Sequence, residues 1–299
     1  MQIERKDLPN TSNSPEDPHK KFPPENRIFT GDCLSVLTEF FPSSTVDMIY
    51  MDPPFFSGRD YPLDTNRGKV LGFNDKWTGG MADYLAWMTP RLRQCHRVLS
   101  EKGSFYLHCN WYADAHLRLL LDQIFDREIR CEIVWDKGFR GTRRRRNWQQ
   151  SHDIILYYTK SDDFIWNEQL QEYADADMKR YNRKDTTGGK YALIKRRRTD
   201  GSVYYGKTYP KGKGVNDVIR LPLLSATSKE RMGYPTQKPE KLLQLLVRAS
   251  TNSGDVVLDP FCGCGTTLVA AKRLKRKWIG IDVSKAACKI SNTRLRQLE

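Results

Sequence analysis

The sequence predicts an α/β fold with a mainly parallel, seven-stranded sheet. Short apolar segments that end near Gly or Asp alternate with helical patterns along most of the chain, which is typical of parallel sheets covered by helices. The 299 residues suit one large domain, or a domain with an insertion, and a substantial core. Between about Asp162 and Gly233 the alternation gives way to polar, basic, Gly- and Tyr-rich sequence. That segment is predicted to be an inserted module outside the sheet.

Each expected element follows from its local pattern. Short apolar runs predict strands at residues 27–30, 46–51, 104–109, 129–135, 153–159, 256–258 and 278–281. Helical periodicity predicts helices at residues 84–99, 112–124, 239–249, 267–274 and 284–298. Pro90 is a candidate kink in the first of these helices. Pro239 suits a first helical position, and Ser284 suits an N-cap.

Composition excludes several classes of protein. No run approaches the roughly 18 to 20 apolar residues that a membrane span needs, which argues against an integral membrane protein. Residues 1–26 are polar, hold five of the 15 prolines and lack the apolar stretch of a signal peptide, so we expect a disordered lead-in. The seven cysteines have no CxxC spacing. This favours reduced thiols in a cytoplasm and no metal site.

The positive charge is concentrated in two segments. The formal net charge is +14; residues 137–146 carry six Lys or Arg and no acid, and residues 178–215 carry twelve against two acids. The two segments together carry +16, which leaves −2 for the rest of the chain. Tyrosines are interspersed in the longer segment. A polyanion, most simply nucleic acid, is the expected partner, and solvated surface charge is the alternative.

The segment VVLDPFCGCGTT, residues 256–267, combines a buried strand with a glycine-rich turn that opens a helix. Glycines let a backbone approach a ligand, and a helix N-terminus offers free N–H groups. The next predicted strand ends at Asp282, seventeen positions after Gly265, where an acid can accept both hydrogens of a ribose diol. The pattern predicts an adenosine-type cofactor and leaves NAD and S-adenosylmethionine as alternatives.

A second motif follows the strand at residues 46–51. It reads Asp52-Pro53-Pro54-Phe55, in which two prolines fix φ, remove two N–H donors and hold the acid and nearby carbonyls in one geometry. A rigid turn that caps a strand is the alternative interpretation. The acid, the two prolines and the aromatic residue together favour a catalytic turn.

With these two motifs the chain resembles the S-adenosylmethionine-dependent amino-methyltransferases of DNA, which form N6-methyladenine or N4-methylcytosine. Asp52 precedes Asp259 by 207 residues, with a basic insert between them, and this order resembles the circularly permuted β class. Further matches are the segments 31–34, 151–158 and 234–239, which read GDCL, SHDIILYY and YPTQKP. The resemblance implies a circularly permuted, Rossmann-like class I methyltransferase fold with an inserted target-recognition region.

By this resemblance the two ends of the chain share one cofactor pocket. It places Asp259, Phe261, Gly263, Gly265 and Thr266 around the methionine part, Asp282 at the ribose, Asp32 with its neighbour Cys33 near the adenine, and Thr236 and Lys238 at the carboxylate. A helix cap is the alternative for Asp32, and a surface lysine before a helix is the alternative for Lys238. His108 is expected to be a packed or surface histidine, and His152 is given no catalytic role.

The proposed chemistry accounts for the residue types in the catalytic turn. The exocyclic amine of adenine is a poor nucleophile because its lone pair is delocalised into the ring. The carboxylate of Asp52 and the carbonyl of Pro53 can accept its hydrogens and aim the amine at the sulfonium methyl. Phe55 can stack on a base that has left the duplex. Methylation of cytosine C5 is excluded, since that subclass needs a Pro-Cys pair and this chain has none.

The sequence therefore predicts a site-specific DNA adenine-N6 methyltransferase that uses S-adenosylmethionine. Residues 27–162 would form the catalytic part of the core, residues 163–233 the target-recognition insert and residues 234–299 the cofactor-binding part. Cytosine N4 in DNA is the first alternative, and the acid at Asp52 favours adenine because many N4 enzymes have Ser there. An RNA base methyltransferase, a silent nucleic-acid-binding module and a nicotinamide oxidoreductase are the others.

DNA is the expected partner. Arg143, Arg144, Arg145 and Arg146 would contact mainly phosphates, and Lys195, Arg196, Arg197 and Arg198 would also reach the grooves. A bacterial or phage origin with a cytoplasmic location is expected. Relatives of this kind are often homodimers, but the sequence leaves the oligomeric state open. The sequence leaves open the recognition sequence and whether a cognate restriction enzyme completes a restriction-modification pair.

Overall fold

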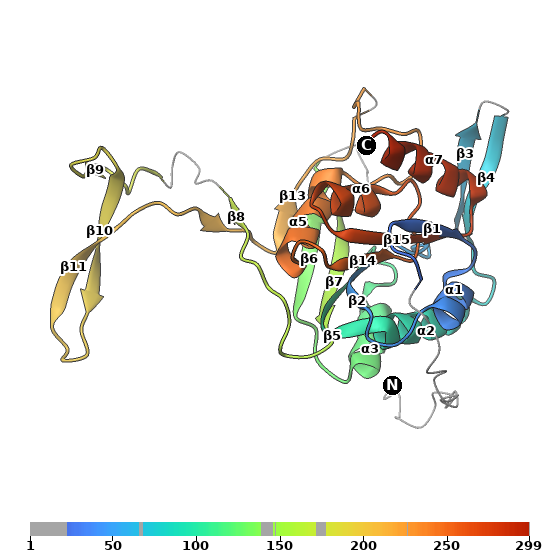
Figure 1. Ribbon diagram of the computed structural model, residues 1–299, viewed down its shortest axis with the longest axis horizontal. Coiled ribbons are helices and arrows are strands. Elements are labelled where there is room, and N and C mark those ends of the chain that lie inside the picture. The colour runs from blue at the N-terminus through green and yellow to red at the C-terminus, as the bar shows by residue number, and fades with distance from the viewer. Residues whose placement is uncertain are drawn as a thin grey trace.

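Figure 1 shows the computed structural model, which describes residues 23–65, 68–138, 146, 148–171, 178–225 and 227–298. Most of the expected lead-in and Arg143–Arg145 lie outside the described residues. The core is an eight-stranded sheet with the strand order β1-β15-β14-β2-β5-β7-β6-β13. Its strands are β1 (Arg27–Thr30), β2 (Val46–Met51), β5 (Leu99–Cys109), β6 (Cys131–Asp136), β7 (His152–Thr159), β13 (Val218–Arg220), β14 (Val256–Asp259) and β15 (Lys277–Asp282).

The sheet is mostly parallel, as predicted, and all seven predicted strands are present. β1, β15, β14, β2 and β5 pair in parallel, whereas β7 is antiparallel to both β5 and β6. The central strand β2 is covered on both faces: Ile49 and Met51 belong to one core cluster, and Met48 and Tyr50 belong to the other. Burial on both faces explains why its sequence is almost continuously apolar.

The expectation that the whole of 163–233 lies outside the sheet was wrong at one point. β13 pairs in parallel with the edge strand β6, with Ile219 opposite Trp135. The indole N–H of Trp135 donates to the Leu221 carbonyl at 2.8 Å, which fixes the chain after β13 against the sheet. Three residues are too few to give a recognisable apolar run, so the sequence pattern could not show this eighth strand.

Helices cover the two faces of the sheet (Figure 1). One face carries α1 (Cys33–Phe40), α2 (Gly80–Val98) and α3 (Asp114–Phe125), and the other carries α5 (Glu240–Ser250), α6 (Thr266–Arg273) and α7 (Lys285–Arg296). Helix α2 continues through Pro90. Ser284 caps α7 as predicted and accepts from the Ala287 amide. Pro239 is the N-cap of α5 rather than its first helical residue.

Two elements near the catalytic turn were not predicted. Helix α1 is only eight residues long. A hairpin of β3 (Arg59–Thr65) and β4 (Gly68–Asp75) follows the catalytic turn. Its sequence contains Pro62 and several charged residues, so it lacks a clear strand pattern.

The insert forms small sheets that stand away from the core (Figure 1). β8 (Leu170–Gln171) pairs with β12 (Lys213–Gly214). β9 (Arg183–Lys184), β10 (Lys190–Arg197) and β11 (Val203–Thr208) make a three-stranded antiparallel sheet in which β10 is central. Most side chains of β10 and β11 are exposed. In the part of the chain that the structure describes, no helix has the length and apolar composition to cross a membrane.

Candidate active site

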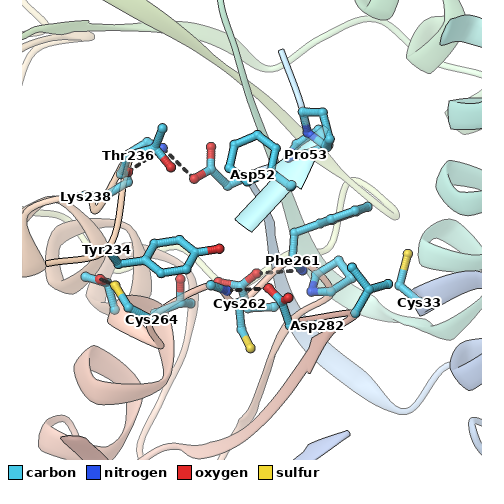
Figure 2. A pocket seen from close by; sticks show the side chains of 18 of the residues that line it. Cys33, Asp52, Pro53, Tyr234, Thr236, Lys238, Phe261, Cys262, Cys264 and Asp282 are labelled. Atoms are coloured by element: carbon cyan, nitrogen blue, oxygen red, sulfur yellow. Dashed lines mark hydrogen bonds and ion pairs between the residues drawn. The ribbon is translucent and has the colours of Figure 1, made fainter. Parts of the chain in front are cut away.

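The predicted site segments meet at one edge of the sheet because the strands before them are parallel neighbours. The segments after β1, β2, β14 and β15 enclose a cavity of about 390 Å³ (Figure 2). Thirteen of the predicted catalytic and cofactor residues line it: Asp32, Cys33, Asp52, Pro53, Pro54, Phe55, Thr236, Lys238, Asp259, Phe261, Gly263, Thr266 and Asp282. The open α/β sheet thus has a pocket at the carboxyl ends of its strands, the usual place for a ligand.

The carboxylate of Asp52 faces this cavity with its two oxygens in different environments. Oδ2 accepts a hydrogen bond from Lys238 Nζ at 2.5 Å, as Figure 2 shows. Oδ1 is buried and has no hydrogen-bond partner among the described residues. Buried carboxylate oxygens are normally paired, so this unpaired oxygen is suited to accept a hydrogen bond from a bound molecule.

Lys238 lines the first cavity and also contacts the catalytic residue Asp52. Its side chain is buried, and its ammonium group contacts Asp52 and the Thr236 carbonyl, at 3.2 Å for the latter. The ammonium also lies 5.2 Å from the centre of the Phe55 ring. The alternative of a surface lysine is excluded by its burial. Lys238 therefore lies beside the catalytic turn, and its contact with the carboxylate end of the cofactor, which the resemblance implies, stays a prediction.

Asp75, at the end of β4, fixes the catalytic turn. Its carboxylate accepts the backbone N–H groups of Phe55, Phe56 and Ser57 at 3.1, 2.9 and 2.7 Å, and the Trp77 indole N–H at 3.0 Å. The side chain is fully buried. Phe56 has a φ of 58°, a conformation that costs a non-glycine residue roughly 1 to 2 kcal/mol. The three hydrogen bonds from backbone amides to Asp75 hold the residue in this conformation.

Sequence reasoning missed Asp75. The available signal was an acid between aromatic residues in the segment FNDKW, and a solvated loop acid would give the same pattern. A further contact acts on the same turn from α2, where the Tyr84 hydroxyl donates to the Pro54 carbonyl at 2.8 Å.

A buried histidine lies behind Asp52. His108 is fully buried, as a packed histidine should be, and its Nδ1 lies 2.6 Å from the Tyr50 hydroxyl and 3.9 Å from Asp52 Oδ1. Burial, and then the positive charge of Lys238, lower the pKa of His108, so the ring is neutral near pH 7. Its Nε2 faces Asp153 at 3.4 Å.

Asp153 is an ion-paired group. Lys137 donates to its other oxygen at 2.6 Å. Burial raises the pKa of Asp153, but the hydrogen bonds and attraction from His108 and Lys137 outweigh it and hold this pKa below its ordinary value. The pair leaves no free negative charge at this point of the site.

The glycine-rich turn is closed by Asp282. Gly263 and Gly265 both have positive φ, 50° and 76°, which favours glycine. Asp282 accepts the amide of Gly263 at 2.8 Å and that of Ser284 at 2.8 Å. A carboxylate has about four acceptor sites, so two remain for a ligand. Gly265 does not line the cavity; it precedes α6, and a Cβ there would lie 2.9 Å from Ser291 Oγ.

Two further acids differ in their availability. Burial, with smaller contributions from Asp52 and Asp282, raises the pKa of Asp259 to about 7. Asp32 caps α1 by accepting the Leu34 amide at 2.9 Å, and its other oxygen pairs with Arg91 at 2.6 Å. The cap interpretation of Asp32 is therefore confirmed, while the residue also lines the cavity. Cys33 beside it is buried, which raises the pKa of its thiol to about 12.

A second cavity, of about 410 Å³, adjoins the first. Phe55, Tyr61, Thr236 and Lys238 line both cavities. The second cavity extends toward the ends of β5 and β6 and the start of β7, where Asn110, Lys137 and His152 lie. Together the cavities give two compartments that meet beside Asp52 and Phe55.

The described residues that were predicted to contact DNA line neither cavity. Arg146 and the side chains of Lys195, Arg196, Arg197 and Arg198 are exposed, and the last four belong to β10 and the turn that follows it. Arg143–Arg145 are outside the described residues.

This arrangement of fold and site is that of a class I methyltransferase. A family model for N6/N4 DNA methylases matches residues 46–293. The chain belongs to this family, the DNA methyltransferases that act on adenine N6 or cytosine N4 with S-adenosylmethionine as methyl donor.

Individual relatives agree with that assignment. Type II methyltransferase M.EcaI of Enterobacter cloacae is 29% identical over 89% of this chain and 68% of its own length. DNA adenine methyltransferase YhdJ of Escherichia coli K12 is 29% identical over 90% of this chain and 82% of its own. The M1.HpyAVI–SAM complex (TM-score 0.58, 20% identity, 90% and 98% coverage) and the cytosine-N4-specific PvuII methyltransferase (0.59, 16%, 89% and 85%) share the fold.

Proposed function

We propose that this enzyme methylates the exocyclic N6 amine of adenine in duplex DNA. The observation that carries the proposal is the asymmetric carboxylate of Asp52, which lines the cavity: Lys238 donates to one oxygen, while the other is buried and has no hydrogen-bond partner among the described residues. A fixed acceptor of this kind binds an amine hydrogen without reorganisation. The carbonyl of Pro53 would accept the second hydrogen, and Phe55 would stack on the base.

The first cavity fits S-adenosylmethionine. Its volume lies within the range of small-molecule sites, and the acids Asp259, which is buried, and Asp282, which is partly buried, complement a cationic ligand. Asp282 would hold the ribose diol, and the glycine-rich turn with Phe261 and Thr266 would hold the methionine part. Asp32 and Cys33 would contact the adenine, and Thr236 would contact the carboxylate end. When bound, the cofactor supplies an electrophilic methyl group on a sulfonium.

The residues of the catalytic turn then act by position. Asp52 and Pro53 direct the amine toward the first cavity, where a carbon–nitrogen bond forms as the carbon–sulfur bond breaks. The amine gives up one proton, and Asp52, whose Oδ1 has no hydrogen-bond partner among the described residues, would accept it. Lys238 keeps the carboxylate in one orientation during this step.

Adenine is favoured over cytosine by the acid at position 52, which many cytosine-N4 enzymes replace with serine. The name of YhdJ as an adenine methyltransferase supports the same choice. The insert, residues 163–233, would select the sequence, between the catalytic part at 27–162 and the cofactor part at 234–299. This division is supported by the exposed, cationic β9–β11 sheet, which stands away from the core (Figure 1).

Nucleoside analysis tests the proposal. The enzyme is incubated with labelled S-adenosylmethionine and either duplex DNA or RNA, and the products are digested and separated. N6-methyladenine in DNA is expected. N4-methylcytosine would overturn the choice of base, and label confined to RNA would overturn the choice of polymer. Asp52→Ala is the matched inactive control.

A further inference from the structure

Two aromatic side chains at the edge of the second cavity have no role in the function described so far. Trp111 and Tyr112 follow β5, and their rings stack with centroids 4.0 Å apart. Each side chain is 47% exposed. Isolated exposed aromatics are common on protein surfaces, but an adjacent exposed apolar pair beside a cavity is characteristic of a binding surface.

The backbone beneath this pair is fixed. Asn110 accepts the Tyr112 amide through its side chain at 3.0 Å, and its carbonyl accepts the amides of Ala113 and Asp114 at 3.3 and 3.2 Å. Ala113 is fully buried at the start of α3. The pair is thus presented on a short, hydrogen-bonded turn, so a ligand would meet a preformed surface.

The pair lies beside the catalytic turn because β5 is the parallel neighbour of β2. Met51, which precedes Asp52, is paired with Leu107, three residues before Asn110. Phe55, Trp111 and Tyr112 line the same cavity. The second cavity therefore has aromatic side chains from two adjacent strand ends.

The polar residues of this cavity favour a nucleotide. Arg59 supplies positive charge that suits a phosphate. The acid in the lining, Asp153, is already bound by Lys137 and His108, so it does not repel one. A base that leaves a duplex loses its stacking, and stacking on aromatic side chains replaces it.

We propose that Trp111 and Tyr112 form a stacking platform for the target base in its extrahelical position and so stabilise the flipped-out state. This inference rests on the proposed function, since it requires a DNA base at Asp52. It names these residues as contributors to the flipping equilibrium. They take no part in the transfer of the methyl group.

The test compares two duplexes with wild type, Trp111→Ala and Tyr112→Ala. In one duplex the target base is paired, and in the other it faces an abasic site, which lowers the cost of flipping. On the paired duplex kcat should fall by about 5- to 150-fold in the variants, which is the effect of losing the stacking of one base. On the abasic duplex kcat should return to near the wild-type value, with the defect appearing in KM.

Two further variants identify the interaction. Trp111→Phe should retain most of the activity because it can still stack. Trp111→Leu fills space without stacking and should behave like Trp111→Ala. Rescue by leucine would overturn the platform and would indicate an apolar wedge inserted into the duplex. A loss of kcat that is equal on both duplexes would also overturn it, because a structural defect does not depend on base pairing.

Controls separate this inference from the proposed function. Phe40→Ala removes an exposed aromatic side chain of α1 that lines neither cavity and should behave as wild type. Affinity for S-adenosylmethionine, measured by calorimetry, should be unchanged in the Trp111 and Tyr112 variants. The duplexes carry whichever base wild type is found to methylate, so an N4-cytosine result would correct the proposed function and leave the platform testable.

Discussion

The carboxyl edge of the main sheet and the β10–β11 hairpin, hereafter the ribbon, use charged residues in opposite ways. At the sheet edge, charged groups such as Asp52, Asp75 and Lys238 are buried or partly buried and hydrogen-bonded to named partners. On the ribbon, Lys195 and Arg197 are exposed. The first region depends on exact partners, whereas the second depends on charge and shape. Substitutions should therefore cause large, specific losses in one and small, graded changes in the other.

The largest effect is expected at Asp52. Asp52→Ala removes the acceptor for the target amine and should lower methyl transfer by more than about 100-fold, the scale for a group that stabilises a transition state. Cofactor affinity measured by calorimetry should stay close to wild type, because Asp52 is hydrogen-bonded to Lys238 and not to Asp282, the residue expected to bind the ribose. Near wild-type turnover would refute the catalytic assignment.

A control is needed because the substitution leaves a buried ammonium without its partner. Loss of one partner of a buried pair costs about 3 to 5 kcal/mol, so Asp52→Ala should also lower Tm. The double variant Asp52→Ala/Lys238→Met should recover much of that Tm while remaining inactive. Activity that returned together with Tm would show that the single variant had failed through unfolding.

The next effect is expected at Asp75. Asp75→Ala leaves the amides of residues 55–57 without an acceptor, and a buried unsatisfied donor costs about 1 to 3 kcal/mol. We expect kcat to fall by about 10- to 100-fold with a clear decrease in Tm. Asp75→Asn, which can still accept through its carbonyl oxygen, should lie between Ala and wild type. Asp60→Ala, at an exposed ion pair with Lys76, is the matched control and should change neither quantity.

These residues show how far the sequence could predict the site. The acid, glycine and proline motifs are local, so the family resemblance that they carry could assign Asp52, Asp259, Gly263 and Asp282 to one site. Asp75 and the Asp52–Lys238 pair join segments that are 18 to 186 residues apart. Nothing in a single sequence states such a pairing.

The fold was predicted with a similar division. Strands and helices with apolar periodicity were identified, while α1, β13 and the hairpin β3–β4 were missed. Each of those is short or polar, and its position depends on tertiary contacts such as Trp135 with the Leu221 carbonyl. The exposed ribbon has the alternation of a strand only in part, because neither face is covered by the core.

A smaller effect is expected at Asp282. Asp282→Ala should weaken cofactor binding by roughly 1.5 to 3 kcal/mol, the contribution of a hydrogen bond to a charged group, and leave turnover at saturating cofactor much less affected. The diol interaction exists in both the ground and transition states, so its removal is a loss of uniform binding. An unchanged KM for the cofactor would place the ribose elsewhere.

The pH dependence of cofactor binding gives a further test of the buried region. Because the pKa of Asp259 is raised to about 7, its carboxylate forms as the pH rises through 7, and only that form attracts a sulfonium. Affinity for S-adenosylmethionine should therefore increase from pH 6 to pH 8, by up to about tenfold per pH unit below the pKa. The demethylated product, which is uncharged at sulfur, should show a much weaker trend, and Asp259→Asn should abolish the trend.

The smallest single-residue effects are expected on the ribbon, whose two faces can be separated. Residues opposite one another in the β10–β11 register share a face, so Lys195 and Arg197 lie on the face of Tyr205 and Val203, while Arg196 lies on that of Tyr204. Arg198 also lies over the Tyr204 ring, at 5.0 Å. A two-stranded ribbon fits the major groove of DNA, where either face can reach base edges or phosphates.

The last prediction uses this separation. Lys195→Ala/Arg197→Ala and Arg196→Ala/Arg198→Ala each remove two positive charges from one face. At least one pair should change which sequences are methylated, if that face reads base edges.

Replacing Arg143–Arg146 with Ala should instead weaken binding to all duplexes similarly and lower the log–log salt slope by about 0.9 for each phosphate that is no longer neutralised. One neutralised phosphate contributes about fivefold to affinity at 0.15 M salt on that slope. Salt titrations and sequencing of methylated sites provide the two measurements. Identical slopes and identical site preference in all three variants would show that the basic segments are only solvated surface, and the contrast between the two regions would then lie between a catalytic site and an inert extension.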